Sequence, residues 1–340
     1  TELPVAWTRA PAICDLNGDG HLDLVFGQEG NLGDATIFYG DGSRNFDRAK
    51  RVKLPGSSGT GGPAVADLNK DSRLDIAFAH RKNALIYYQA GDGTFPEARR
   101  VVLPVQAKTI TIADVNRDGW LDLVCPFYKG RGRRSGYSTI LLGSAEGYSL
   151  DRAIQLPTDG GTGSIVSDFN RDGYPDVFFF CHRADGSPDE IGKYGDHHTF
   201  SLLYWGGPAG FDPCNRLEVP SVGAHYDVGV DLGHIRDRGF EFVYVSSPFR
   251  AGGRRPVHLT WWGETPHRSS IRFQLRTAST LAGLRRSEWR GPEGPGSFFE
   301  KRSQDIRGVP AGEWIQYRAV FASDNGAYSA VLDGVEIFFR

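Results

Sequence analysis

The chain has 340 residues, of which 39% are hydrophobic and 12% aromatic, and its formal net charge is −2. This balance excludes strong electrostatic attraction to nucleic acid or to an anionic membrane, and no segment approaches the roughly 20 apolar residues of a membrane-spanning helix. The length suffices for two domains, and the 44 glycines and 19 prolines predict the many turns of an all-β architecture.

The chain begins at Thr1 and contains no methionine, which indicates a processed or trimmed chain, with a removed secretion signal as one explanation. Its four cysteines, Cys14, Cys125, Cys181 and Cys214, are too few for a disulfide scaffold. Cys181 and Cys214 fall within one repeat and could pair, but buried free thiols in strands are at least an equal alternative.

An acidic nonapeptide is repeated four times along the first half of the chain. The copies occupy residues 15–23, 67–75, 114–122 and 168–176, and they begin 52, 47 and 54 residues apart. Each reads Asp-x-Asn-x-Asp-Gly-x-x-Asp, except that Ser72 replaces the glycine in the second copy. A period of about 50 residues is typical of one four-stranded propeller blade per repeat.

Short apolar runs surround each acidic loop. Residues 110–113 precede the third loop, residues 121–125 follow it, and a third β-rich segment comes next at residues 138–142. In each repeat a fourth segment ends in Leu-Pro or Val-Pro. Runs this short, bounded by Gly, Asn and Asp, are strands rather than helices. We therefore predict propeller blades over residues 1–222, with no helix among them.

The acidic loops have the oxygen donors that calcium requires. Side-chain oxygens stand at positions 1, 3, 5 and 9, and the carbonyl of position 7 adds a main-chain donor, so the side chain at position 7 is expected to be free to vary. Glycine at position 6 permits the sharp turn, which makes the loop with Ser72 the weakest. An EF-hand is excluded, because the flanks are strands and position 12 of the first loop is Phe26 rather than Glu.

Four such loops at blade spacing predict up to four structural Ca²⁺ ions rather than ordinary Asp- and Asn-rich turns. An affinity in the extracellular range, about 10⁻⁴–10⁻³ M, would keep the sites filled outside a cell, so we expect a secreted or cell-surface protein. The predicted ligands are Asp15, Asn17, Asp19, His21, Asp23, Asp67, Asn69, Asp71, Arg73, Asp75, Asp114, Asn116, Asp118, Trp120, Asp122, Asp168, Asn170, Asp172, Tyr174 and Asp176.

These motifs also carry a family resemblance. Residues 9 to about 220 resemble the FG-GAP/VCBS repeats of integrin α-subunit propellers and of many secreted bacterial proteins, and the nonapeptides match position by position apart from Ser72. The resemblance implies a β-propeller in which each loop joins the first two strands of a blade, on one face, and holds structural calcium. It does not imply one function, because family members include adhesion receptors, lectins and polysaccharide lyases.

The connections after the second strand of each blade should lie on the opposite face. They are short in the first two blades but long in the third and fourth, at residues 128–137 and 182–198. Long loops inside a regular repeat are commonly functional. Charged side chains there could bind an acidic sugar or a carboxylate, with Tyr128 or Tyr194 stacking on a sugar ring; a solvated surface with incidental charge is the alternative. The candidates are His80, Arg81, Lys129, Arg131, His182, Arg183, Asp196, His197 and His198.

The repeat ends after Pro220, and residues 231–237 lack the side chains of a fifth calcium loop. Polar–apolar alternation predicts a β-sandwich domain over residues 223–340, which loosely resembles a jelly roll. A Gly- and Pro-rich stretch at residues 290–297 should form a long loop. The predicted strands are residues 240–247, 256–262, 271–277, 314–322 and 328–339.

Two questions about this portion stay open. One of the neighbours Trp261 and Trp262 should face the core and the other solvent, where it could stack on a sugar or pack under a loop. Residues 1–8 and 221–262 could supply a further degenerate blade, or the chain could be part of a longer protein.

The residues leave three classes of function open. A binding or adhesion module for extracellular glycan or a cell-surface protein is favoured, because no Ser-His-Asp or Cys-His arrangement and no phosphate-binding loop is recognisable. A carbohydrate-active enzyme such as a polysaccharide lyase would use His80 or His182 as the base, with Arg or Lys neutralising a uronate. A structural subunit of a surface layer or filament would self-assemble. Nucleic acid is not an expected partner.

Overall fold

The computed structural model describes residues 11–30, 32–43, 45–46, 49–80, 82–130, 133–182, 198–223 and 240–340, together with Leu3, Val5 and Thr8. The chain forms two compact units, Thr1–Arg238 and Gly239–Arg340. The described residues are almost entirely β-structure, as predicted: they contain one short α-helix, α1 (Leu281–Leu284), and two 3-10 turns, η1 (Glu97–Arg99) and η2 (Leu150–Arg152). None of their helices is long or apolar enough to cross a membrane.

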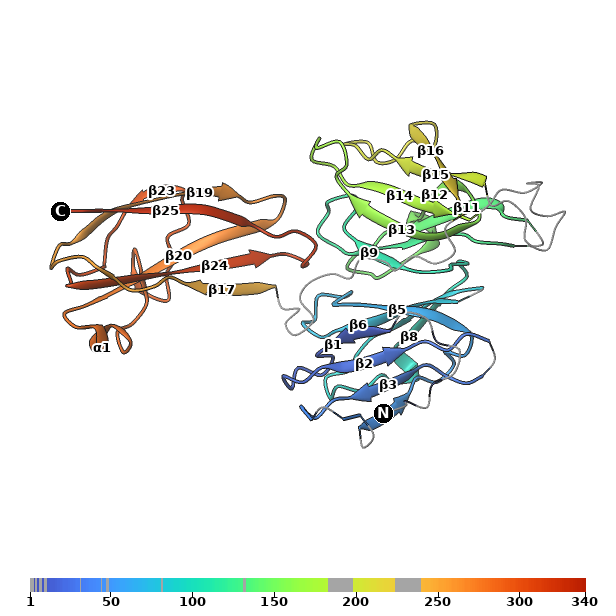
Figure 1. Ribbon diagram of the computed structural model, residues 1–340, viewed down its shortest axis with the longest axis horizontal. Coiled ribbons are helices and arrows are strands. Elements are labelled where there is room, and N and C mark those ends of the chain that lie inside the picture. The colour runs from blue at the N-terminus through green and yellow to red at the C-terminus, as the bar shows by residue number, and fades with distance from the viewer. Residues whose placement is uncertain are drawn as a thin grey trace. The chain divides into compact units, whose positions relative to one another are not determined.

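The first unit contains four antiparallel sheets of four strands each, in chain order, and we call these sheets the first to fourth blades (Figure 1). The first blade comprises β1 (Ala12–Cys14), β2 (Asp23–Phe26), β3 (Thr36–Tyr39) and β4 (Lys50–Lys53). The second comprises β5 (Thr60–Ala66), β6 (Asp75–His80), β7 (Ala84–Tyr87) and β8 (Arg100–Leu103). The third comprises β9 (Thr111–Ala113), β10 (Asp122–Cys125), β11 (Ser135–Leu141) and β12 (Ile154–Asp159). The fourth comprises β13 (Gly161–Ser167), β14 (Asp176–Cys181), β15 (His198–Tyr204) and β16 (Arg216–Val222).

Buried side chains join neighbouring blades. Val25 and Ile37 of the first blade share one hydrophobic cluster with Ile76 and Phe78 of the second. A separate cluster joins the third blade to the fourth. The described residues do not form a closed ring of sheets, so the structure confirms the all-β blades and leaves the propeller a prediction.

The two ends of each blade differ in what they carry. Every acidic loop joins the first strand of a blade to the second, and we call this the acidic end. Because the strands are antiparallel, the connection from the second strand to the third lies at the opposite end. The long connection expected in the fourth blade is present there, between β14 and β15. The one expected in the third blade is wrong: β11 begins at Ser135, so the connection has nine residues, 126–134, as many as the connection 27–35 of the first blade.

The second unit is built from two sheets (Figure 1). Ile271, Phe273 and Leu275 of one sheet pack with Leu259 and Trp261 of the other in a shared core. The larger sheet has the order β17-β24-β20-β21-β22, with β18 also paired to β24, and the smaller has the order β23-β19-β25. The strands are β17 (Glu241–Val245), β18 (Phe249–Arg250), β19 (Pro256–Glu264), β20 (Ser269–Ala278), β21 (Arg290–Gly291), β22 (Gly294–Pro295), β23 (Ser303–Asp305), β24 (Trp314–Ser323) and β25 (Val331–Phe339).

The structure corrects two expectations for the C-terminal portion. Strands β17, β18 and β19 belong to the two sheets of the second unit, so residues 241–262 do not form a further blade. The stretch at residues 290–297 is not a plain loop, because it contains β21 and β22. The expected domain boundary at residues 222–223 adjoins residues 224–239, which lie outside the described residues.

The predicted alternation of the tryptophan pair is confirmed, because Trp261 is 4% exposed and Trp262 is 47% exposed. All four cysteines are free thiols. Cys14, Cys125 and Cys181 are buried and Cys214 is exposed, so no disulfide joins Cys181 to Cys214.

Candidate functional site

The first carboxylate of each acidic loop organises the turn that follows it. In the first loop, Asp15 accepts hydrogen bonds from the main-chain N–H groups of Asp19, at 3.0 Å, and Gly20, at 2.7 Å. The second and fourth loops repeat both bonds, and the third repeats the bond from position 6. The carboxylate at position 1 therefore stabilises the turn conformation of its own loop through these hydrogen bonds.

The last aspartate of each loop links three strands of its blade. One carboxylate oxygen of Asp122 accepts the N–H of Val115, at 2.8 Å, and the other accepts the N–H of Gly143, at 2.9 Å. Val115 follows the first strand, Asp122 begins the second and Gly143 follows the third. The other three blades repeat both bonds. The exposed fraction is 0% at Asp23, Asp75, Asp122 and Asp176.

Burial makes these carboxylates costly to ionise. Desolvation raises the pKa of Asp23 to about 6, of Asp75 to about 7 and of Asp122 to about 8, although two main-chain N–H groups oppose the shift at each one. The negative charges at positions 1 and 5 raise these pKa values further. A divalent cation among the carboxylates would relieve this repulsion, so the donor set fits Ca²⁺.

Calcium binding itself stays a prediction. Among the described residues, no three His, Cys, Asp or Glu side chains converge in the arrangement of a preformed metal site. The predicted side-chain ligands at positions 1, 3 and 5 are instead hydrogen-bonded within their own loops, as when Asn17 donates to Asp19 at 2.9 Å.

Each loop needs two left-handed residues. The one at position 6 was predicted, and it is glycine except at Ser72, whose φ is 64°. The one at position 4 was not predicted, because Lys70, Arg117 and Arg171 stand there with φ between 59° and 63°. Non-glycine residues reach this region only at some cost. Only the first loop has a glycine at position 4, Gly18 with a φ of 73°, so the left-handed conformation of the other three could not be recognised from their residue type.

Neighbouring loops contact one another through side chains that the calcium pattern leaves unassigned. The Lys70 ammonium lies 4.8 Å from the ring centre of Trp120, and the Arg117 guanidinium lies 4.2 Å from that of Tyr174. In both cases a cation at position 4 of one loop meets an aromatic ring at position 7 of the next. The side chains at position 7, which the calcium pattern does not restrict, thus contribute contacts between loops at Trp120 and Tyr174.

At the opposite end, the structure gathers charged residues from several blades around Tyr128. Lys108 and Arg134 lie 5.6 Å and 4.8 Å from the centre of the Tyr128 ring, and the His182 ring centre lies 5.8 Å from it. Lys108 also pairs with Glu29 of the first blade at 3.3 Å. Protein side chains thus already pack around the Tyr128 ring, which was predicted to stack on a sugar.

The predicted ligand-binding residues do not form one exposed cluster within the described part of the chain. His182 is buried, with 5% of its surface exposed, whereas Lys129 is exposed. His80 is half-buried, and its Nδ1 accepts the main-chain N–H of Lys82 at 3.3 Å. Only the backbone of His198 is described. Six further predicted residues lie outside the described part of the chain: Arg81, Arg131, Arg183, Tyr194, Asp196 and His197.

A groove that the sequence did not reveal lies between the third and fourth blades. Its volume is about 530 Å³, and the phenol of Tyr137 and the ring of Phe200 are 58% and 49% exposed beside it. Arg216 and Glu218 form an ion pair at 2.9 Å along its wall. Pro157 and Asp159 of β12 also line the groove. Tyr137, expected at the end of the basic connection of the third blade, lies instead in β11, close to where that connection ends.

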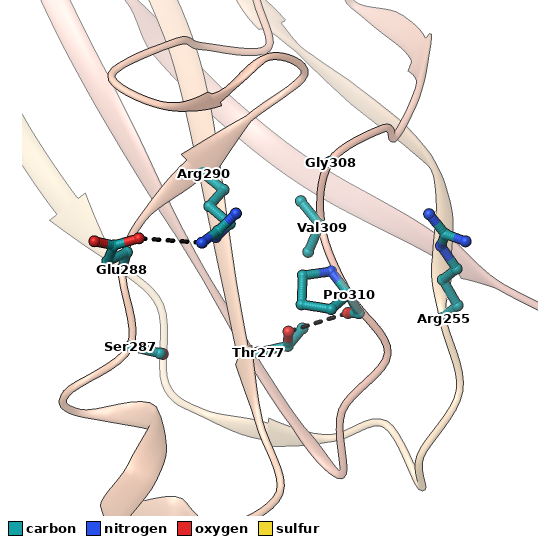
Figure 2. Close-up of a pocket in the computed structure, with 8 residues that line it drawn as sticks. All are labelled: Arg255, Thr277, Ser287, Glu288, Arg290, Gly308, Val309 and Pro310. Atoms are coloured by element: carbon teal, nitrogen blue, oxygen red, sulfur yellow. Dashed lines mark hydrogen bonds and ion pairs between the residues drawn. The ribbon is translucent and has the colours of Figure 1, made fainter.

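A second cavity, of about 450 Å³, lies within the second unit (Figure 2). Arg290 and Glu288 line one side and form an ion pair at 3.1 Å, while Arg255 stands on the other side, beyond Pro310. The Thr277 hydroxyl donates to the carbonyl of Pro310 at 3.0 Å. Several polar groups of this cavity are thus already engaged by the protein, and aromatic rings do not line it.

Comparison with known proteins identifies repeats in the first part of the first unit. The family model of the FG-GAP-like repeat matches residues 15–78 and 67–125. A phosphatidylinositol-glycan-specific phospholipase D of Rattus norvegicus is 28% identical over an alignment of 189 residues, and the match covers 44% of this chain and 22% of the relative. The matched region therefore spans about a fifth of that relative's length.

Solved structures resemble the chain only distantly. An Agrocybe aegerita lectin that recognises non-reducing terminal N-acetylglucosamine is 16% identical, with 88% of this chain and 66% of that chain covered and a TM-score of 0.39. An arabinoxylan arabinofuranohydrolase of glycoside hydrolase family 43 from Bacillus subtilis is 11% identical, with 99% and 97% covered and a TM-score of 0.35. At scores this low, neither structure assigns a ligand or an activity to this chain. The chain is thus an almost entirely β-structured protein that carries FG-GAP-like repeats in its first unit.

Proposed function

We propose that this protein is an extracellular, calcium-stabilised binding module whose first unit recognises a glycan. The groove between the third and fourth blades is the observation that supports the proposal most directly. Two half-exposed aromatic rings, Tyr137 and Phe200, stand beside the polar groups of Asp159, Arg216 and Glu218. Sugar rings have apolar faces that stack on aromatic side chains and hydroxyl edges that hydrogen-bond to charged groups, so this lining suits a short glycan segment.

Calcium has a stabilising role in this proposal. The acidic loops would hold Ca²⁺ at the acidic end, away from the connections between second and third strands. Each ion would offset two of the three negative charges of its loop, which include that of the buried aspartate that links three strands. Loops of this kind commonly bind calcium at millimolar levels, which favours an extracellular setting.

Calcium dependence is tested separately from ligand binding. Protein treated with chelator and then titrated with CaCl₂ in a calorimeter should show up to four binding events, and its thermal unfolding temperature should rise with calcium. Mg²⁺ should be much weaker, because it demands a smaller octahedral shell. An unfolding temperature and a heat signal that do not respond to CaCl₂ would refute the metal assignment.

Ligand recognition is tested on a glycan array in millimolar calcium, with the Phe200→Ala and Tyr137→Ala variants beside the original protein. We expect binding to a restricted set of glycans and a loss of about ten-fold or more in each variant, since one well-buried aromatic contact contributes about 1.4 kcal/mol or more. Phe242→Ala is the matched control, because Phe242 is 43% exposed in the second unit. Equal binding by all three variants and the original protein would place the ligand elsewhere.

The same experiment distinguishes the alternatives. Supernatants are assayed for new unsaturated or reducing ends, and their appearance would replace the binding proposal with a lyase or hydrolase. A protein that binds no glycan but forms ordered assemblies would instead be a structural subunit.

A further inference from the structure

Three arginines stand side by side on the outer face of the larger sheet of the second unit. Arg272 and Arg276 alternate along β20 with Ile271, Phe273 and Leu275, whose side chains enter the core on the other face. Arg318 lies on the neighbouring strand β24, directly opposite Gln274, and Gln316 lies opposite Arg276. We call Arg272, Arg276, Arg318 and these two glutamines the arginine face.

Carboxamides, rather than carboxylates, hold two of these arginines in place. Arg276 donates from Nε to the Gln316 Oε1 at 2.9 Å, and Arg318 donates from Nε to the Gln274 Oε1 at 2.8 Å. In each case Nη2 of the same arginine donates to the same oxygen. Both guanidinium groups are therefore oriented without being neutralised.

Main-chain carbonyl groups hold the two glutamine side chains in place. Gln274 donates to the carbonyl of Ser297, and Gln316 donates to the carbonyl of Ser246, each at 2.6 Å. Their exposed fractions are 0% and 7%. Since each carboxamide nitrogen is engaged by a carbonyl, the oxygen must point toward its arginine. A loop-to-glutamine-to-arginine chain of hydrogen bonds thus sets the direction of each guanidinium before any ligand arrives.

The charge on this face is not balanced by the protein. Glu241 of β17 pairs with Arg272, and no other acidic side chain in the described part of the chain forms an ion pair with the three arginines. Elsewhere in the same unit Arg250 pairs with Glu313 and Arg268 pairs with Asp324. Arg276 and Arg318 have lowered pKa values, from partial burial and from repulsion by the neighbouring arginine. An anion over the face would relieve this repulsion.

Aromatic rings stack on the flat faces of the three guanidinium groups. The Arg276 and Arg318 guanidinium groups lie 4.2 Å and 5.2 Å from the ring of Trp289, and that of Arg272 lies 4.4 Å from the ring of Phe298. The stacking leaves the N–H edges of the guanidinium groups as the groups available for hydrogen bonding. Within the described residues, Nη1 of Arg318 has no protein acceptor, and Nη1 of Arg276 has only the carbonyl of Arg285 at 3.5 Å.

We propose that the arginine face is a binding site for an acidic polysaccharide that carries carboxylate or sulfate groups. Oriented guanidinium edges match the paired oxygens of either group. Arg272 and Arg276 are four residues apart on one strand, about 13 Å at 3.3 Å per residue. Arg318 lies between them on β24 and shares the Trp289 ring with Arg276, so three cations line this length of the face and suit a polymer that carries one anionic group per sugar or per disaccharide. Duplex DNA has a phosphate charge about every 1.7 Å, and its binding commonly needs more basic contacts than this face offers.

The test measures binding of the full chain to immobilised polygalacturonate, dextran sulfate, neutral dextran and duplex DNA, at low and at physiological ionic strength. We expect binding to polygalacturonate, dextran sulfate or both, weakening with salt, and no binding to neutral dextran. Preference between the two acidic polymers identifies carboxylate or sulfate as the ligand group. Equal or tighter binding to DNA would overturn the proposal in favour of a general polyanion site, and failure to bind either acidic polymer would overturn it outright.

Variants connect the binding to these residues. Arg276→Gln and Arg318→Gln should each weaken binding about ten-fold, which corresponds to about 1.4 kcal/mol, whereas Arg250→Gln, the matched control, should not change it. Glu241→Gln should strengthen binding, because it removes the carboxylate that competes for Arg272. A gain of affinity cannot come from misfolding, so this variant keeps the test decisive if the arginine variants unfold. Unchanged affinity in Arg276→Gln, Arg318→Gln and Glu241→Gln would refute the site.

The site is independent of the groove in the first unit. Tyr137→Ala and Phe200→Ala should leave polygalacturonate and dextran sulfate binding unchanged. If these two variants abolish it instead, the acidic polymer binds the groove and the arginine face has no part in recognition.

Discussion

Replacing Ser72 with glycine should stabilise the second acidic loop. Ser72 stands at position 6 with a φ of 64°, where the other three loops have glycine at 86°, 93° and 89°. A Cβ built on Gly20, the equivalent residue of the first loop, has no other atom within 4 Å. The penalty at Ser72 is therefore that of the left-handed backbone itself rather than of crowding by neighbours.

The size of the gain follows from two opposing terms. A left-handed conformation costs an ordinary residue about 1–2 kcal/mol. Glycine offsets about 0.4–1 kcal/mol of this gain, because it gives the unfolded chain more conformational freedom. The free energy of unfolding should thus rise by about 0.5–1 kcal/mol. The backbone N–H of residue 72 still donates to Asp67, since the substitution leaves the main chain unchanged.

The assay is urea unfolding followed by hydrogen exchange in β5 and β6, with and without calcium. Ser72→Ala keeps the strain and serves as the control, so its stability should stay close to that of the original protein. Gly20→Ser should destabilise the first loop by the amount that Ser72→Gly gains. If Ser72→Gly is neutral or destabilising while Ser72→Ala is also neutral, backbone strain at position 6 is not what distinguishes the second loop.

Three further predictions concern the first unit. A thiol reagent should label Cys214 alone in the native protein between pH 7 and 9, because the other three cysteines are buried and burial raises the pKa of Cys125 to about 12; mass spectrometry that finds more than one rapid adduct would contradict this. Arg117→Ala and Tyr174→Ala should be non-additive by about 0.5–1 kcal/mol in a double-mutant cycle of unfolding, since their contact joins two loops. Asp122→Asn should lower the free energy of unfolding by about 1–3 kcal/mol, because one buried main-chain N–H loses its acceptor. A loss of only about a few tenths of a kcal/mol would refute the strand-linking role.

Much of the fold could be predicted because the repeat is explicit in the sequence. The acidic loops mark where the first strand of each blade ends, and the apolar runs beside them became strands such as β9 and β10. Alternation of polar and apolar residues likewise located β20 and β24 in the second unit. Both signals are local, since they depend only on which side chains must be buried within one strand.

The candidate sites were less predictable because they depend on contacts between distant residues. Position 4 of each loop is left-handed, yet the three residues Lys70, Arg117 and Arg171 give no local sign of it. The groove pairs Tyr137 with Phe200, which are separated by more than one repeat. The arginine face needs the register of β20 against β24, which a pattern of alternation cannot supply.

The aspartate that links three strands also determines where the chain tolerates change. Every blade secures its strands at the acidic end, while the connection from second to third strand varies from three residues in the second blade, 81–83, to sixteen in the fourth, 182–197. A foreign segment inserted at that end would be anchored at two adjacent strands about 4.8 Å apart. The blades therefore offer a frame for loop grafting and library selection, in which new recognition segments are exchanged one at a time without redesigning the scaffold.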